Sequence, residues 1–378
     1  MNIAFFESIT PYWVNLQEHL YTKHGFNMYF IKKEYLGYDM DDLISMTTFI
    51  PHYFAEESKR PGISMNKSKN IWRFRELFQI LKENNPDLVI SVEFSLLTVQ
   101  LILLKYLTFR KYKVIVRTDD SFYLIKHGWS IKHIIARKIV SKFTDAFILC
   151  DKRVYDLYIG EKYPSIFFPI IQDDIMFRKK LVDALAPSNS YIDDYGLLGK
   201  KVVLFVGRLI ELKNVGLIIK SLNRLNRQDI VFVVVGSGDG SKDDRERLWK
   251  EEASKSCQKV FFVGQLTGQD LLAWYNVANV LVLPSIREAF GAVVNEALLA
   301  GCECIVSDAA GSASIIEDGV NGYVFESNNI EDLTSKLQRT LECNPCSFRN
   351  TIRDSKMLFS FKQIIEDVDE CLSKLKKK

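Results

Sequence analysis

Residues 284–301 constrain the fold of this chain more than any other segment, because a short turn here joins a strand pattern to a helix pattern. The apolar residues 280–283 that precede them are typical of a buried strand. The helical pattern ends before Gly301, and glycine is common directly after the last residue of a helix. This order places the first amide groups of the helix, around residues 290–293, at the carboxyl end of a parallel sheet. We expect an anion-binding site there, because those amides have no partner within the helix and the helix dipole favours negative charge.

Two acidic residues in this stretch, Glu288 and Glu296, are eight positions apart. On one continuous helix this spacing corresponds to a rise of about 12 Å and a rotation of about 80°. The two carboxylates therefore cannot grip one atom, as a metal-binding or acid/base pair would. They could instead hold the two ends of an extended ligand with an anionic middle, and a nucleotide-diphospho-sugar has this form. The alternative is that both are solvated glutamates on an amphipathic helix.

The pattern PS-x-x-E-x-FG-x-x-x-x-E-A-x-x-x-G resembles the E-x7-E signature of retaining glycosyltransferases of family 4, which have the GT-B fold. The two acids of the signature fall on Glu288 and Glu296. Its frame falls on Pro284, Ser285, Phe290, Gly291, Ala297 and Gly301. The resemblance implies an α/β protein of two Rossmann-like, doubly wound domains that face each other across a cleft. It also implies that Glu288 holds the donor sugar and Glu296 the ribose, with Ala289, Phe290 and Gly291 beside the donor.

Composition agrees with a soluble globular protein of about two domains. The chain has 378 residues, 47% of them hydrophobic, with a mean hydropathy of −0.02. No uninterrupted apolar run approaches the roughly 18 to 20 residues of a membrane span. The first residues, MNIAFF, lack the basic region of a signal peptide, so we expect a cytoplasmic protein. A net charge of only +3 argues against general binding of nucleic acid.

Strand and helix patterns alternate in two runs, as in doubly wound parallel sheets. We expect a Rossmann-like, acceptor-binding domain in residues 1–165 and an irregular interdomain linker in residues 166–199. A second Rossmann-like domain, which would bind the nucleotide-sugar, is expected in residues 200–355. Residues 356–378 resemble the terminal helix of the family, which crosses back to the first domain.

A loop with two cations follows the strand pattern of residues 201–206. It contains Gly207, Arg208 and Lys213, and the sequence GRLIELKN resembles the G-R-x-x-x-x-K motif of the family. Arginine and lysine suit phosphate oxygens, and the resemblance implies that they neutralise the donor pyrophosphate. Residues 236–240 are a glycine-rich turn whose contact with a ligand is left open. Gln265 lies in a loop that resembles the base-contacting loop of the family, which makes it the candidate for base recognition.

The first domain departs from the family pattern. Residues 7–12 contain no glycine, and the histidine that often follows the strand of residues 113–117 is replaced by Arg117-Thr-Asp-Asp120. Glu93, Asp119 and Asp120 are therefore candidates for orienting the sugar or the acceptor. The alternative is that they form ordinary turns at strand ends.

Residues 105–142 contain ten lysines and arginines against two acids. The segment includes Trp129 and a predicted helix over residues 131–143 with isoleucines on one face. Two interpretations remain open. The segment could lie against anionic lipid headgroups, or the isoleucine face could pack in the protein core, which alone would explain the helix.

Seven cysteines are present. The pairs Cys302-x-Cys304 and Cys343-x-x-Cys346 have spacings that could suggest zinc, but Cys302 and Cys304 lie in an apolar strand pattern and no histidine lies near either pair. Reduced thiols are the favoured interpretation.

These features predict a retaining glycosyltransferase, a hexosyltransferase with Arg208, Lys213 and Glu288 as catalytic residues. The donor would be a UDP- or GDP-sugar, and neither a metal nor another cofactor would be required. The acceptor would be a glycan or lipid-linked glycan of a cell-surface polysaccharide such as lipopolysaccharide or capsule. The alternatives are a non-catalytic nucleotide-sugar-binding subunit and a GT-B epimerase or phosphorylase. A nicotinamide-dependent dehydrogenase is disfavoured, since no G-x-G-x-x-G follows the first strand.

Overall fold

The computed structural model describes residues 1–6, 13–24, 27–30, 47–49, 74–128, 130–343 and 349–377. The chain divides into two compact units. The N-terminal unit comprises Met1–Asp120, Ile125–Ile170 and Lys362–Lys378, and the C-terminal unit comprises Ser121–Leu124 and Ile171–Phe361. The loop of residues 7–12, Trp129 and Cys346 lie outside the described residues.

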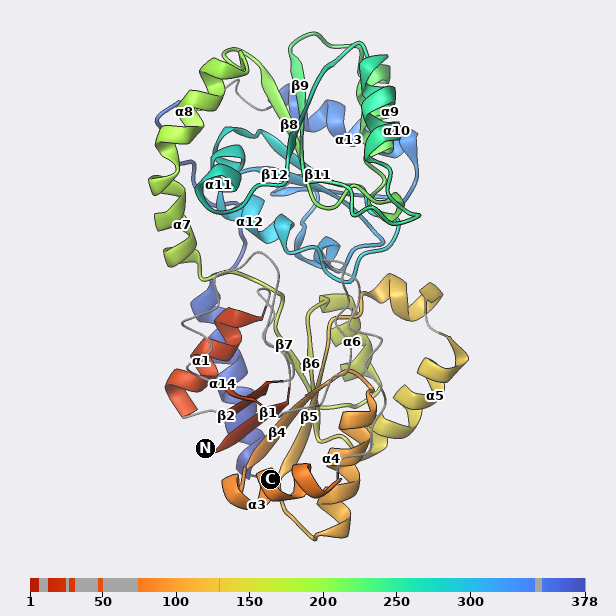
Figure 1. Cartoon of the computed structure of the whole chain (residues 1–378), viewed down its shortest axis with the longest axis vertical. Helices are drawn as coiled ribbons and strands as arrows, with labels where there is room; N and C mark the ends of the chain where they lie inside the picture. The colour runs from red at the N-terminus through yellow and green to blue at the C-terminus, as the bar shows by residue number, and fades with distance from the viewer. Residues whose placement is uncertain are drawn as a thin grey trace. The chain divides into compact units, whose positions relative to one another are not determined.

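The N-terminal unit is built on a parallel sheet with the strand order β3-β2-β1-β4-β5-β6-β7. Its strands are β1 (Ile3–Phe6), β2 (Asn27–Phe30), β3 (Thr47–Phe49), β4 (Leu88–Val92), β5 (Lys113–Thr118), β6 (Ala146–Leu149) and β7 (Ser165–Phe167). Its helices include α1 (Val14–His24), α3 (Phe74–Asn84), α4 (Leu96–Leu107), α5 (Ile131–Val140), α6 (Lys152–Gly160) and α14 (Phe361–Lys377). Helices α1 and α14 lie on one side of the sheet and α4, α5 and α6 on the other (Figure 1). Such a sheet buries both faces, which explains the almost uninterrupted apolar strands.

The C-terminal unit has a second parallel sheet with the order β10-β9-β8-β11-β12-β13. Its strands are β8 (Lys201–Val206), β9 (Ile230–Val235), β10 (Lys259–Gly264), β11 (Val280–Leu283), β12 (Glu303–Ser307) and β13 (Gly322–Phe325). Its helices are α7 (Asp174–Asp183), α8 (Leu185–Asp194), α9 (Val215–Leu225), α10 (Glu246–Ser254), α11 (Gly268–Val277), α12 (Val293–Leu299) and α13 (Ile330–Cys343). The core on one face joins Phe205 and Phe232 of the sheet to Ile218 of α9 and Leu337 of α13. The predicted architecture of two doubly wound α/β sheets is confirmed.

The strand order of the C-terminal unit reverses direction between β8 and β11. The chain moves outward from β8 to β9 and β10, then returns to pair β11 with the other edge of β8. The helices that follow these two strands, α9 after β8 and α12 after β11, therefore lie on opposite faces of the sheet. Ligands of open α/β sheets bind at the carboxyl ends of the strands at such a switch point.

Residues 166–199 are not an irregular linker as expected. They contain the helices α7 and α8, and from Ile171 onward they belong to the C-terminal unit. Pro187 does not break α8, because it is the third residue of the helix, in the first turn, where the backbone N–H has no helical partner to lose. The side-chain amide of Asn276 on α11 donates to Leu181 O of α7 (2.9 Å) and to Ser188 Oγ of α8 (3.1 Å), which fixes the helix pair against the unit.

Helix α14 returns the chain to the N-terminal unit. The Asp369 carboxylate on α14 binds His19 Nε2 at 3.0 Å and Lys23 Nζ at 2.5 Å, both on α1. Near its end, Lys376 Nζ lies 2.9 Å from the Asp87 carboxylate before β4. The N-terminal unit is therefore assembled from both ends of the chain.

The isoleucine face of α5 does not pack in the core, which corrects one of the two interpretations of this helix. Ile131, Ile134, Ile135 and Ile139 are exposed, and Val140 is the buried residue of the helix. The helix ends at Val140 and a short 3₁₀ turn, Ser141–Phe143, follows. Among the described residues, no helix is both long enough and apolar enough to span a membrane.

Candidate functional site

Three glycines form the carboxyl edge of the sheet in the C-terminal unit. Gly207, Gly236 and Gly264 follow or end the adjacent strands β8, β9 and β10. Gly207 N donates to Val235 O (3.0 Å), and Gly236 N donates to Gly264 O (2.7 Å). Gly236 has a φ of +142°, and a Cβ atom there would lie 1.8 Å from the carbonyl oxygen of Gly207. Only glycine permits this close approach of two backbones.

The loops after β8 and β11 meet beside this edge. Lys213 Nζ forms an ion pair with the Glu288 carboxylate, and both side chains are largely buried. Ser285 Oγ donates to the same carboxylate oxygen at 3.2 Å. The backbones of the two loops are joined by the bond from Ile286 N to Leu212 O (2.9 Å). The switch point thus holds a cation and an acid side by side, and both come from the residues that the sequence singled out.

Arg208 lies on the same loop as Lys213 but has a different partner. Its Nη1 atom is 3.5 Å from Asp239 Oδ2 in the glycine-rich turn after β9, and the arginine side chain is 40% exposed. Its charge is thus available at the surface of the sheet edge. Asp239 was not selected from the sequence, because a lone aspartate in a glycine turn is an ordinary turn residue.

Glu288 does not lie on the helix that carries Glu296, which corrects the geometric argument from the sequence. Helix α12 begins at Val293, and Glu288 forms an isolated bridge with Ala310 before it. The intervening Gly291 has a φ of +94°, and a Cβ atom there would lie 2.5 Å from Leu283 Cδ2. The turn at Gly291 ends the extended conformation, so helical rise and rotation do not relate the two glutamates.

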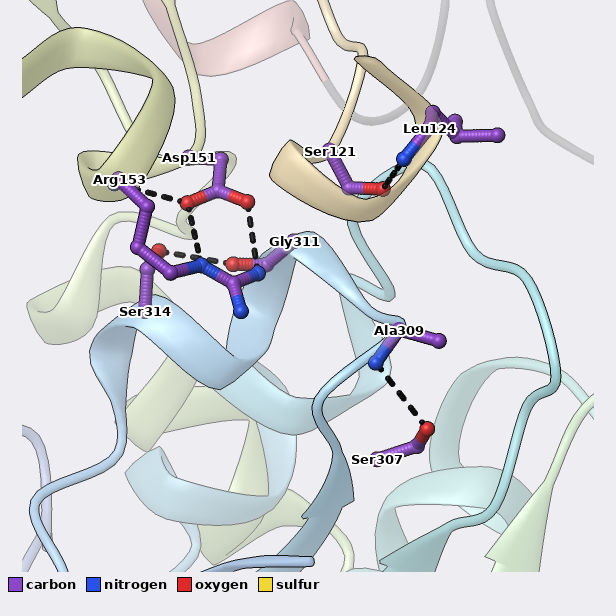
Figure 2. Close-up of polar contacts among 8 residues, drawn as sticks. All are labelled: Ser121, Leu124, Asp151, Arg153, Ser307, Ala309, Gly311 and Ser314. Carbon is purple, nitrogen blue, oxygen red and sulfur yellow. Dashed lines mark hydrogen bonds and ion pairs between the residues drawn. The ribbon is translucent and has the colours of Figure 1, made fainter. Parts of the chain in front are cut away.

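The loop from Glu288 to Gly291 rests on the segment after β12. Glu288 N donates to Ala309 O (3.3 Å), and Ser312 N donates to Phe290 O (2.8 Å), while the Phe290 side chain is buried. That segment is itself fixed by local bonds, from Ala309 N to Ser307 Oγ and from Ser314 Oγ to Gly311 O, both visible in Figure 2. The backbone around Ala289 and Phe290 is therefore held on a rigid support.

Glu296 lies apart from the Lys213–Glu288 pair and has a partner of its own. Its carboxylate accepts a 2.7 Å hydrogen bond from Tyr275 Oη on α11 and a hydrogen bond from the side chain of Gln172. Burial raises the pKa of Glu296, and these two hydrogen bonds lower it. Tyr275 and Gln172 were missed from the sequence, since neither lies in a motif and both reach Glu296 only through the tertiary fold.

Gln265 lies at the rim of the same edge. It is exposed on the loop after β10, where Ser237 Oγ donates to its Oε1 atom at 3.5 Å. Among the described residues, it makes no hydrogen bond or ion pair with Arg208, Lys213 or either glutamate. The structure therefore places it one strand farther along the sheet edge than the Arg208–Asp239 pair.

In the N-terminal unit the structure brings together the three predicted acids, Glu93, Asp119 and Asp120. They follow the adjacent strands β4 and β5, and Thr118 Oγ1 bridges Glu93 Oε2 (3.3 Å) and Asp120 Oδ2 (3.4 Å). Glu93 has a φ of +56°, which is unusual for a residue other than glycine. Burial, together with the nearby Asp119 and Asp120 charges, raises the pKa of Glu93 well above its ordinary value.

An ion pair that the sequence did not reveal follows the next strand, β6. Arg153 Nε and Nη2 donate to the two oxygens of the buried Asp151 carboxylate at 3.0 and 2.7 Å, in the fork geometry that Figure 2 shows. Asp151 also caps α6 by accepting from Arg153 N. The D-x-R spacing that produces this fork reads as an ordinary helix cap in the sequence.

The raised pKa of Glu93 predicts a dependence of stability on pH. Because the pKa is higher in the folded than in the unfolded state, the folded chain binds more protons between the two values. The free energy of unfolding should therefore fall as the pH rises from the ordinary value of 4.5 through the folded-state pKa. Glu93→Gln should remove this loss, and thermal unfolding from about pH 4.5 to about pH 8 measures it.

The matched control is Glu76→Gln, at an exposed glutamate on α3 of the same unit. It should leave the pH dependence of wild type unchanged. A stability difference between wild type and Glu93→Gln that is constant across the pH range would contradict the assignment.

The thiols of Cys302 and Cys304 are buried against backbone carbonyls, at 3.3 Å from Tyr275 O and 3.7 Å from Val294 O, respectively. The side chain of Cys343 lies outside the description, as does Cys346. Within the described ranges, no group of three or more His, Cys, Asp or Glu residues could hold a metal ion.

The two Rossmann-like units, with a switch point carrying paired charges, define a GT-B fold. Anabaena HepE in complex with UDP superposes on the chain with a TM-score of 0.74, at 14% identity, over 99% of this chain and all of the other. The apo form of a lipopolysaccharide outer core galactosyltransferase, WaaB, gives a TM-score of 0.67 at 16% identity, over 99% of both chains. At these identities the likeness establishes the fold.

The family-model comparison locates its match in the C-terminal half of the chain. Residues 190–356 match the family model described as glycosyl transferases group 1. An uncharacterized glycosyltransferase of Methanocaldococcus jannaschii is 35% identical over 143 residues, which is 38% of this chain and 36% of the relative. The sulfoquinovosyl transferase of Arabidopsis thaliana is 32% identical over 146 residues, which is 38% of this chain and 27% of the relative. The chain thus spans about a third of the length of the curated relatives that it matches.

Proposed function

We propose that this protein is a retaining glycosyltransferase that transfers a sugar from a nucleotide-diphospho-sugar to a glycan. The observation that carries the proposal is the pairing of Lys213 with Glu288 at the switch point of the C-terminal sheet, across 75 positions of sequence. The family-model match of residues 190–356 covers both residues and supports the same activity.

In this mechanism, the bond between the anomeric carbon and the diphosphate breaks as a bond to the acceptor hydroxyl forms on the same face. Arg208 and Lys213, with the backbone amides around Ala289, Phe290 and Gly291, would stabilise the negative charge that develops on the departing diphosphate. The proton of the acceptor hydroxyl would pass to an oxygen of the leaving diphosphate. No separate base and no metal would then be required.

The remaining residues would recognise the donor. Glu288 would accept hydrogen bonds from the sugar hydroxyls, Glu296 from the ribose, and Gln265 would contact the base. A UDP- or GDP-sugar is the proposed donor. The solved HepE structures are complexes with UDP, with UDP and glucose, and with UDP-glucose, which favours the first.

The acceptor would be a glycan or lipid-linked glycan of a cell-surface polysaccharide, handled on the cytoplasmic side of a membrane. Glu93, Asp119 and Asp120, which converge after β4 and β5, would orient its hydroxyl groups. In this proposal, the acids would act in place of the histidine that often follows the strand of residues 113–117 in the family.

The second candidate is a subunit that binds a nucleotide-sugar without turnover. It is favoured by the same departure in the N-terminal unit, where Arg117-Thr-Asp-Asp120 replaces the expected histidine. Such a protein would keep the donor residues of the C-terminal unit and bind its ligand normally.

One measurement separates these functions. Purified protein is given UDP-, GDP- and ADP-sugars, and release of the nucleoside diphosphate is followed with and without glycan acceptors. Release that depends on an acceptor and is lost in Arg208→Ala supports the transferase. Donor binding without release in any combination supports the binding subunit, and absence of both overturns the proposal.

Tyr275→Phe tests how Glu296 is held. Loss of the hydroxyl removes a hydrogen bond of a partly buried carboxylate, and we expect donor affinity to fall by about threefold to tenfold. The value of kcat should change little, because Tyr275 would act through Glu296 on the ribose and not on the reacting atoms. Donor titration calorimetry measures the affinity, steady-state release of the nucleoside diphosphate measures kcat, and the melting temperature is recorded alongside.

A merely structural role would lower the melting temperature without changing donor affinity, and that outcome would contradict the positioning role. Tyr191→Phe is the matched control, since its hydroxyl also donates to a carboxylate in this unit, Asp270, at 3.1 Å.

A further inference from the structure

Helix α5 presents an apolar face to solvent. Ile131, Ile134, Ile135 and Ile139 are between 50% and 76% exposed. At about 100° per residue, these four side chains fall within an arc of about 140°, and Val140 faces the opposite way toward the sheet. Soluble proteins usually turn such a stripe toward their core. Here the apolar stripe faces solvent instead, and the helix lies at the periphery of the N-terminal unit (Figure 1).

The apolar surface continues from α5 onto the end of α4. The ring of Phe143, after α5, makes an edge-on contact with the ring of Tyr106 on α4, with 5.9 Å between centroids. Leu107 and Phe109 follow Tyr106 and are 68% and 90% exposed. We call these residues with the four isoleucines the α5 surface. It joins two helix ends and is too large to be a scattering of single exposed side chains.

Positive charge is interleaved with this apolar surface. Lys138 lies within the isoleucine arc, Lys132 lies beside it, and Lys142 follows in the 3₁₀ turn after α5; all three are exposed. None of them forms an ion pair with another residue in the part of the chain that the structure describes. The sequence of α5, IKHIIARKIV, contains no acid. The inward-facing Arg137, by contrast, donates from Nε to Tyr158 Oη at 2.9 Å and from Nη2 to Glu161 Oε2 at 2.6 Å.

We propose that the α5 surface binds the surface of an anionic lipid bilayer. Apolar side chains would enter the boundary between headgroups and acyl chains, while the lysines would pair with the phosphates. A second copy of this chain fits less well, because a symmetric contact through α5 would bring lysines of equal charge together without any acid to balance them. The proposal stands apart from glycosyl transfer, because the donor residues all lie in the other unit.

Flotation with lipid vesicles tests the proposal. The full chain should float with vesicles of phosphatidylcholine and phosphatidylglycerol but not with phosphatidylcholine alone, and added salt should weaken binding. Ile135→Asp with Ile139→Asp should abolish flotation. The triple change Lys132→Glu, Lys138→Glu and Lys142→Glu should weaken binding by more than about a hundredfold, since each lysine contributes about fivefold near an anionic surface.

The matched controls lie in the C-terminal unit. Ile175→Asp alters an isoleucine that is 77% exposed, and Lys179→Glu with Lys255→Glu alters exposed lysines. Both should float like wild type, and all variants should keep the melting temperature and donor binding of wild type. Failure of wild type to float, or equal loss in the controls, would overturn the proposal. So would a dimer in sedimentation that the α5 changes dissociate without any binding to vesicles.

Discussion

Lys213→Met should lower kcat for release of the nucleoside diphosphate by about a hundredfold to a thousandfold, the cost of removing one donor to a developing anion. The substitution keeps much of the length and apolar volume of the side chain but removes the charge that would stabilise the leaving diphosphate. It also leaves the largely buried Glu288 carboxylate with Ser285 as its remaining side-chain partner among the described residues. Steady-state kinetics with the preferred donor and acceptor measure the effect.

The control for this substitution is Lys220→Met. Lys220 lies on α9 of the same unit and its side chain is 60% exposed. Its Nζ atom is 3.6 Å from Glu252 Oε1, which makes this a surface ion pair. Lys220→Met should leave kcat within about twofold of wild type, because a surface ion pair contributes little to stability. If Lys213→Met retained kcat and raised only the KM for the donor, the lysine would bind ground state and transition state equally, and its catalytic assignment would be wrong.

Gly236→Ala should destabilise the C-terminal unit by at least about 3 kcal/mol. The new Cβ atom would lie 1.8 Å from the Gly207 carbonyl oxygen, and two backbones would have to separate. Separation would break the row of hydrogen bonds that aligns the carboxyl ends of β8, β9 and β10, and donor binding should be lost with it. Urea unfolding and donor titration measure the two losses.

Gly240→Ala is the control, since Gly240 also has a positive φ, of +66°, but nothing lies within 4 Å of the added Cβ. It should cost only the backbone strain, about 1 kcal/mol. Equal destabilisation by the two substitutions would mean that the close approach of Gly236 to Gly207 has no energetic importance.

The sheets of this protein could be predicted from the sequence because their strands are buried on both faces. Strand β4 (Leu88–Val92) and helix α4 (Leu96–Leu107) are examples, since each is an apolar run between turn residues and leaves little ambiguity. Lys213 and Glu288 were each singled out by a motif that follows a strand, but the ion pair between them was not predicted. Parallel strands bring such ends to one edge.

Other features depend on information that a local pattern does not contain. Glu288 and Glu296 were placed on one helix because periodicity does not reveal the backbone turn at Gly291, where φ is +94°. The isoleucines of α5 have the spacing of a core face, and a spacing cannot say whether core or solvent lies opposite. Tyr275, Gln172 and Asp239 reach the candidate site through packing of distant elements, so no motif marks them.

The return of α14 to the N-terminal unit has a consequence for how the protein is made. A ribosome releases residues 362–377 only after the whole C-terminal unit has been synthesised. Until then, Asp369 cannot form its ion pairs with His19 and Lys23, and Lys376 cannot pair with Asp87. The first unit to emerge is therefore the last to be completed, and an excised fragment of residues 1–170 would lack its closing helix. A circular permutant that joins α14 directly to β1 would instead deliver the N-terminal unit as one continuous piece.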